Sequence, residues 1–164
     1  SEPLALASAQ AMGRRVDPSD KWWTKHEAAN MRECGGMDDF LACVAEAGDR
    51  LVVVDFYARW CGACRALAPK LAKIAEANPD VIVLKVEFDD NKDMCRSMGV
   101  KVLPFFQLYR GAEGKVASFS ASLSKSHKLA DAVAEHDLLG NARKAKEAAS
   151  GDREKSRDEM PTSR

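Results

Sequence analysis

Residues 51–65 read Leu-Val-Val-Val-Asp-Phe-Tyr-Ala-Arg-Trp-Cys-Gly-Ala-Cys-Arg, and the rest of the chain is organised around them. It opens with an apolar, β-branched run, broken only by Asp55, which is typical of a strand buried on both faces of a sheet. Residues 65–77 carry apolar side chains along one side and predict a helix. Cys61 and Cys64 stand between the two elements, so a pair of cysteines is predicted at the start of a helix that follows a buried strand.

Two cysteines at a helix N-terminus are suited to redox chemistry. The free N–H groups and the positive end of the helix dipole favour a thiolate there, and Arg59 and Arg65 flank the motif. Cys61, nearer the helix tip, is predicted to be the attacking thiolate, and Cys64, one turn further in, the resolving thiol. Such a pair breaks the disulfide of a partner by exchange and takes over the disulfide itself.

Two other interpretations of Cys-x-x-Cys are weaker. A structural zinc site needs four ligands, but the other cysteines and the histidines are isolated in the sequence: Cys34, Cys43, Cys95, His26, His127 and His136. A structural disulfide between neighbours on one turn closes a short loop and stabilises little. The strand, Trp-Cys-x-x-Cys and helix together favour the redox interpretation, and we expect neither a metal nor a cofactor.

The sequence resembles the thioredoxins from about residue 31 to about residue 136. Residues 54–64 match the active-site stretch of that family. Pro69 falls at its kink proline, and Gly111 at the turn glycine between the last two strands. Residues 102–104, Val-Leu-Pro, match the loop whose proline is cis.

A more specific resemblance is to the atypical Cys/His-rich, or lilium-type, thioredoxins of plant and algal chloroplasts. The stretches that carry it are 22–23, 51–56, 78–81, 94–95, 102–106, 109–111 and 118–120. One departure from typical thioredoxins is the pair Gly62 and Ala63, where they have Gly-Pro. A second is that Ala68 and Ala72 replace the His and Cys that give the subgroup its name, so roles of those residues are not carried over.

Asp55 is an acid within a predicted buried strand, where a lone carboxylate is unfavourable unless it is protonated or paired. One interpretation is an inward-pointing acid tolerated by a nearby cation. The resemblance implies instead that Asp55 lies beneath the motif and exchanges a proton with Cys64, while Lys85 on the neighbouring strand pairs with Asp55. We favour the functional role because buried titratable groups near a nucleophile are a recurrent tuning device.

The resemblance also implies which residues support the substrate. Pro104 would be cis, so that its loop lies against Cys61, keeps metal out of the dithiol, and lets the backbone of Leu103 pair with an extended substrate segment. Trp60 would cover one side of the site. The expected substrate-binding and supporting residues are Trp60, Gly62, Ala63, Lys85, Leu103 and Pro104.

Alternating patterns along the chain predict an α/β fold. The expected strands are 31–34, 51–57, 81–86, 105–109 and 115–120. The expected helices are 38–47, 65–77, 91–98 and a last one that begins near Ser124 and carries Leu129, Val133 and Leu138. These elements give a central mixed sheet of about five strands with helices on both faces, the thioredoxin arrangement.

The 164 residues leave room for one domain with tails. Residues 1–20 are small and polar, and they are expected to form a flexible arm or the end of a plastid transit region. Residues 21–140 form the expected thioredoxin domain. Residues 141–164 are rich in charges of both signs, and beyond Gly151 a disordered tail is expected. Just after the arm, Trp22 and Trp23 are expected to pack back on the domain, with a partner-docking patch as the alternative.

Composition excludes several classes. The net charge of zero gives no basic surface for general nucleic-acid binding, and no apolar stretch approaches the length of a membrane span. Five cysteines cannot all pair within one chain, which argues against a stapled secreted domain. Cys43 and Cys95 are expected to be small buried residues, with a second, regulatory disulfide through Cys95 as the alternative.

We therefore predict a monomeric thiol–disulfide oxidoreductase that acts on protein disulfides. The resemblance implies the chloroplast stroma, with the cytosol as alternative, and electron exchange between target enzymes and 2-Cys peroxiredoxin in the oxidising direction. A second hypothesis is an ordinary reductant fed by a thioredoxin reductase. A third, from another class, is a non-catalytic module that docks partners through the thioredoxin surface, the two tryptophans and the tail.

Overall fold

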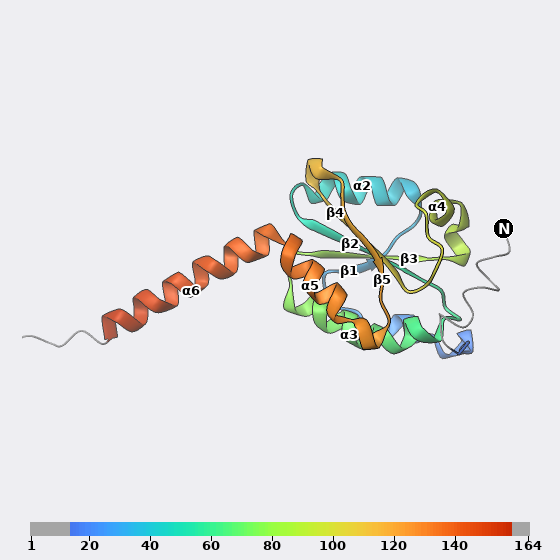
Figure 1. Ribbon diagram of the computed structural model, residues 1–164, viewed down its shortest axis with the longest axis horizontal. Coiled ribbons are helices and arrows are strands. Elements are labelled where there is room, and N and C mark those ends of the chain that lie inside the picture. The colour runs from blue at the N-terminus through green and yellow to red at the C-terminus, as the bar shows by residue number, and fades with distance from the viewer. Residues whose placement is uncertain (1–13, 159–164) are drawn as a thin grey trace, which may run out of the picture.

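Five strands form one mixed sheet at the centre of the fold (Figure 1). The computed structural model describes residues 14–158. The strands in chain order are β1 (Met31–Glu33), β2 (Leu51–Tyr57), β3 (Ile82–Glu87), β4 (Phe105–Arg110) and β5 (Lys115–Ser120). Their order across the sheet is β1-β3-β2-β4-β5. Both β1 and β2 run parallel to β3, whereas β4 is antiparallel to β2 and β5 to β4, so the predicted mixed sheet is confirmed.

The central strand β2 is buried on both faces, as its apolar run predicts. Val54 and Phe56 belong to the core cluster on one face of the sheet, and Val53 belongs to the cluster on the other face. Each such side chain contributes roughly 1.5–3 kcal/mol when it is removed from water. Because successive side chains of a strand alternate, Asp55 faces the same side as Val53.

Helices cover both faces of this sheet (Figure 1). The helices in chain order are α2 (Met37–Ala47), α3 (Gly62–Ala77), α4 (Lys92–Ser97), α5 (His127–His136) and α6 (Leu138–Asp158), of which the first four cover the sheet (Figure 1). In Figure 1, α2 and α4 lie on one face, and α3 and α5 lie on the other. The start of α3 lies at one end of the sheet, and α6 leaves the domain from the opposite end.

Helix α3 begins three residues earlier than the sequence pattern predicts, at Gly62 instead of Arg65. Cys61 is its N-cap, so both cysteines belong to the helix terminus. The predicted apolar stripe is confirmed, because Leu67 and Leu71 are buried. The sequence therefore places the motif correctly but underestimates how far the helix reaches back over it.

The C-terminal region differs from the expected disordered tail, since α6 continues to Asp158, while residues 159–164 lie outside the described residues. The last predicted helix is also divided: Asp137 ends α5, and its Oδ1 accepts a hydrogen bond from the N–H of Gly140 at 3.0 Å. Leu138, which the pattern predicts on the same helix as Leu129 and Val133, lies instead at the start of α6 and is 52% exposed. The prediction failed because α6 depends on alanine and long polar side chains with high helix propensity and has no apolar face to reveal it.

The expected flexible arm also differs in its described part, residues 14–20. The chain there forms a short 3-10 turn, Pro18–Asp20, and the N–H of Val16 donates to the carbonyl O of Trp60 at 3.1 Å. Residues 1–13 lie outside the described residues. Within the described part of the chain, no helix has the length and apolar character that crossing a membrane requires.

Candidate redox-active site

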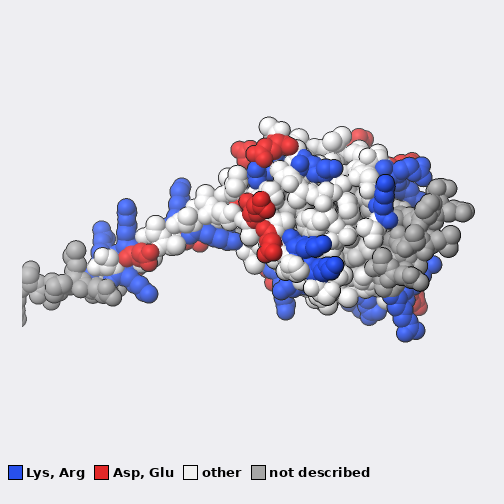
Figure 2. Space-filling model, viewed as in Figure 1, with Lys and Arg blue, Asp and Glu red and all other residues white. Residues whose placement is uncertain are grey.

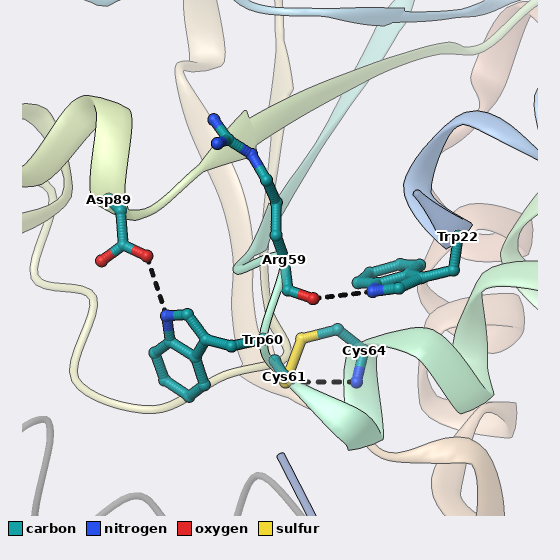
Figure 3. Close-up of a disulfide and its surroundings, with 6 residues drawn as sticks. All are labelled: Trp22, Arg59, Trp60, Cys61, Cys64 and Asp89. Carbon is teal, nitrogen blue, oxygen red and sulfur yellow. Dashed lines mark hydrogen bonds between the residues drawn. A yellow bond between two sulfur atoms is a disulfide. The ribbon is translucent and has the colours of Figure 1, made fainter. Parts of the chain in front are cut away.

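A disulfide joins Cys61 and Cys64 at the N-terminus of α3, with their Cα atoms 5.3 Å apart. The N–H of Cys64 donates to the Sγ of Cys61 at 3.2 Å (Figure 3). This contact is the cap of the helix, and it puts the sulfur of Cys61 where an N-terminal N–H stabilises negative charge. Both residues are buried, Cys61 at 0% and Cys64 at 5% exposure.

The two arginines beside the motif are engaged by carboxylates. Arg59 pairs with Asp90 and lies 3.8 Å from the Oε2 of Glu87, and Arg65 lies 3.1 Å from the Oδ2 of Asp20. Each arginine charge is therefore partly neutralised by its partner. The terminus of α3 remains the feature that most directly favours a thiolate at Cys61.

Asp55 lies beneath the disulfide. It is 6% exposed, and it lines a small cavity with Cys64 and Pro104. The cavity measures about 10 Å³, which is close to the volume that one water molecule needs. The pKa of Asp55 is raised from 3.8 to about 7: burial raises it most, the positive charge of Lys85 opposes this, and the negative charge of Glu33 adds a smaller increase.

Lys85 is less directly tied to Asp55 than the resemblance implies. The two residues are opposite each other in the register of β2 and β3. The Nζ of Lys85, however, donates to the carbonyl O of Trp23 at 2.6 Å and lies 3.4 Å from the carboxylates of both Glu27 and Glu33. Lys85 thus acts on Asp55 through its charge, while its hydrogen bonds are directed to the segment that precedes β1.

The loop before β4 has the predicted geometry, since the Leu103-Pro104 peptide bond is cis. Pro104 lines the cavity below the disulfide, and Leu103 is 1% exposed. The predicted pairing of the Leu103 backbone with a substrate segment stays a prediction, as do the roles assigned to the other site residues.

Two tryptophans hold the motif from different directions (Figure 3). The Nε1 of Trp22 donates to the carbonyl O of Arg59 at 2.7 Å, and the Nε1 of Trp60 donates to the Oδ2 of Asp89 at 2.8 Å. Trp22 is 4% exposed and packs edge-on against Tyr57, with ring centroids 5.8 Å apart. The prediction that this aromatic pair packs back on the domain is confirmed for Trp22, whose burial contradicts the docking-patch alternative.

The remaining cysteines, Cys34, Cys43 and Cys95, are buried free thiols. Burial, with the charges of Glu87 and Asp89, raises the pKa of Cys95 to about 12, so this thiol is protonated at neutral pH. The interpretation of Cys95 as a quiet buried residue is therefore supported. Among residues 14–158, no cluster of His, Cys, Asp and Glu could hold a metal ion.

Sequence reasoning missed several residues of this site. Asp89 and Glu33 are ordinary acids in the sequence, and only the fold brings them to Trp60 and Lys85. Nothing in the polar arm predicted that the backbone of Val16 bonds the carbonyl O of Trp60. The one available clue was the pair of tryptophans, which is unusual in so polar a neighbourhood.

Comparison with known proteins identifies the family. The thioredoxin family model matches residues 36–135. The chain belongs to the thioredoxin family. The thioredoxin of Fasciola hepatica has the same fold, with a TM-score of 0.60 and 33% identity over 65% of this chain and 99% of that one. The short form of thioredoxin f from spinach chloroplast gives a TM-score of 0.59 and 34% identity over 65% of this chain and 92% of that one.

Two plant relatives are more similar in sequence. Thioredoxin-like 2, chloroplastic, of Oryza sativa subsp. japonica is 52% identical over 117 residues, which cover 71% of this chain and 54% of that protein. Thioredoxin-like 2-2, chloroplastic, of Arabidopsis thaliana is 47% identical over 132 residues, which cover 77% of this chain and 56% of that protein. The chain thus spans about half the length of the curated relatives it matches.

Proposed function

We propose that this protein is a thiol–disulfide oxidoreductase that exchanges disulfides with protein targets. The observation that carries the proposal is the Cys61–Cys64 disulfide at the start of α3, above a buried acid and beside a cis proline. In this oxidised form the pair accepts two electrons from a dithiol. In its reduced form it donates two electrons to a disulfide.

Reduction of a target begins with the thiolate of Cys61. It attacks one sulfur of the target disulfide, a mixed disulfide forms, and the other target sulfur leaves as a thiolate. The thiol of Cys64 then loses its proton and attacks Cys61, which restores the Cys61–Cys64 disulfide and releases the second target thiolate. The same steps in reverse oxidise a target dithiol.

Asp55 is the proposed general base for Cys64. Its pKa of about 7 leaves a substantial ionised fraction near neutral pH, so it can take a proton in one step and return it in the reverse step. The cavity that it shares with Cys64 has room for about one bridging water. Lys85 holds a positive charge near Asp55 and limits how far burial raises its pKa.

The setting is proposed to be the chloroplast, the location in the names of the rice and Arabidopsis relatives. A thioredoxin f2 of the same fold is known in a complex with ferredoxin:thioredoxin reductase, with a TM-score of 0.58 and 30% identity over 64% of this chain and 93% of that one. A reductase of this kind is a candidate electron donor here. Exchange with 2-Cys peroxiredoxin and a monomeric state are further parts of the proposal.

The test uses single cysteine substitutions. Cys61→Ser should abolish the reduction of a protein disulfide, because it removes the nucleophile, whereas Cys64→Ser should accumulate covalent mixed disulfides with targets. Cys43→Ser, a change at a buried free thiol, is the matched control and should keep the activity. Partners that bind a Cys61→Ser/Cys64→Ser double variant as well as the wild type, and never covalently, would favour the docking module instead.

The direction of electron flow follows from the reduction potential of the Cys61–Cys64 couple. A value near roughly −270 mV, as for thioredoxin, supports a general reductant. A value toward roughly −200 to −230 mV, as for glutaredoxins, supports a protein that passes oxidation to its targets. Thiol labelling across a range of dithiothreitol redox ratios measures it directly.

A further inference from the structure

The N-terminal segment (residues 14–16) lies across the redox motif. The N–H of Val16 donates to the carbonyl O of Trp60 at 3.1 Å, a backbone-to-backbone bond of the kind that an extended peptide makes with its binding site. The carbonyl group of Arg14 lies against Gly62, so close that a Cβ at that position would collide with it. The segment therefore contacts both the residue before Cys61 and the residue after it.

A side chain of the segment also has a defined place. The guanidinium of Arg15 lies over the indole of Trp60, 4.6 Å from the ring centroid. This ring donates its N–H to Asp89, and the carboxylates of Glu87 and Asp90 lie nearby, with Arg59 as their shared cation. Because a carboxylate bonded to the indole N–H increases the negative charge of the ring, the face of Trp60 is suited to a cation.

The disulfide itself is not accessible in this state. Cys61 is 0% exposed, and thiol–disulfide exchange requires an incoming thiolate to reach a sulfur atom. A target that reacts with this site must therefore displace whatever covers it, and in the described residues the segment is what crosses the motif.

We propose that the N-terminal segment is an internal occupant of the target groove, and that targets displace it with an extended segment that carries Arg or Lys over Trp60. This inference rests on the proposed disulfide exchange and adds to it a class of target, basic around its reactive cysteine. The segment and the target compete for the same backbone carbonyl of Trp60 and the same aromatic face. Access to the disulfide is thus set by how often the segment opens.

The experiment starts from the oxidised full chain and measures the rate at which the Cys61–Cys64 disulfide is reduced. Three thiol probes are compared. One is dithiothreitol, and the other two are peptides with two cysteines each that differ only in the residue beside the first cysteine, which is Arg in one and Glu in the other. In each case the thiols of the probe become a disulfide while Cys61 and Cys64 become thiols. Dithiothreitol reports access alone, and the peptide pair reports the preference for a cation.

Two variants separate the contacts of the segment, and a third is their control. Arg15→Ala removes the cation from Trp60 and should speed reduction by dithiothreitol roughly 2- to 5-fold. Val16→Pro removes the N–H that bonds Trp60 and should give roughly a 5-fold increase. Arg153→Ala is the matched control, because it loses the same charge from an exposed side chain of α6, away from the motif (Figure 1), and its rate should equal that of the wild type.

The peptides test the chemistry of the target. The Arg peptide should reduce the wild type roughly 2- to 5-fold faster than the Glu peptide, with a larger ratio in Arg15→Ala, where the ring is vacant. Equal rates for the two peptides would overturn the basic target class. Unchanged dithiothreitol rates in both Arg15→Ala and Val16→Pro would overturn the internal occupant. Either result leaves the proposed function standing, since that fails only if wild type and variants alike cannot reduce a protein disulfide.

Discussion

The two ends of the chain are ordered for opposite reasons. Residues 14–25 form little regular structure beyond two 3-10 turns, yet Trp22 is 4% exposed and its indole bonds the backbone of the redox motif. Helix α6 is 21 residues long and has no buried face, and it projects away from the domain (Figure 1). Packing holds the first region, and local helix propensity holds the second.

The two regions also differ in the contacts that their polar side chains make. Lys and Arg side chains recur along α6 on the surface, with acidic side chains among them (Figure 2). Within residues 14–158, the hydrogen bonds from α6 side chains to the rest of the domain come from its first two turns, through Asn141, Arg143 and Lys144. The N-terminal region, by contrast, directs its contacts at the functional site. The N-terminal region contacts the site because the buried ring of Trp22, the aromatic anchor of this region, fixes it there.

The largest expected effect comes from removing that anchor. Trp22→Ala should lower the free energy of unfolding by about 3–5 kcal/mol, because a large buried ring leaves a cavity. Trp22→Phe is the control, which keeps most of the ring packing and loses only the bond to the Arg59 carbonyl, for about 1–2 kcal/mol. Urea unfolding measures both. If Trp22→Ala lowered the free energy of unfolding by less than about 1 kcal/mol, packing would not be what holds the N-terminal region, and the contrast with α6 would disappear.

The next effect concerns Asp55, which lines a small cavity together with Trp22 and Trp23. Burial raises its pKa from 3.8 to about 7 in the folded protein, so the folded state retains a proton that the unfolded chain releases. The stability linked to this proton is fully present below about pH 4 and is lost as the pH rises through about 7, by on the order of 4 kcal/mol.

Asp55→Asn cannot ionise and should therefore gain stability relative to the wild type between about pH 4 and about pH 8. Below about pH 4 the Asp55 side chain is protonated in the folded and the unfolded wild type. The difference in stability between the variant and the wild type at that pH therefore measures the effect of the side-chain exchange alone. Chemical denaturation across this pH range is the measurement. A difference between the two proteins that stays constant with pH would contradict a raised pKa at Asp55.

The smallest expected effect is at α6. Arg143 bonds Asp80 at 2.8 Å and Glu147 at 2.8 Å on the surface, so Arg143→Ala should cost at most about 1 kcal/mol, and less in high salt. Lys146→Ala, the same loss of charge on the same helix, is the control and should have almost no effect. Thermal unfolding at low and high salt compares them. A loss above about 2 kcal/mol would mean that α6 is held by packing after all.

Several features of the site could be predicted from the sequence because they are local. The buried run of residues predicts a strand, and the apolar stripe of helical period predicts the helix that follows it. Both cysteines lie at the start of that helix, as the pattern predicts. The cis bond before Pro104 was predicted only through family resemblance, since no local pattern distinguishes a cis from a trans proline. The prediction of a disordered tail beyond Gly151 was wrong, because a helix without an apolar face leaves no periodic signal in the sequence.

The α/β layout, the position of the dithiol and the burial of β2 could all be predicted before the structure, because they depend on short-range periodicity and on which side chains avoid water. Three contacts became visible only in the folded chain: Trp22 bonds Arg59 across 37 positions, Lys85 is shared among Glu27, Glu33 and the Trp23 carbonyl, and Arg15 lies over Trp60. These contacts join residues far apart in the chain, and their partners are chosen by the geometry of the packed sheet and helices. No local pattern records that choice.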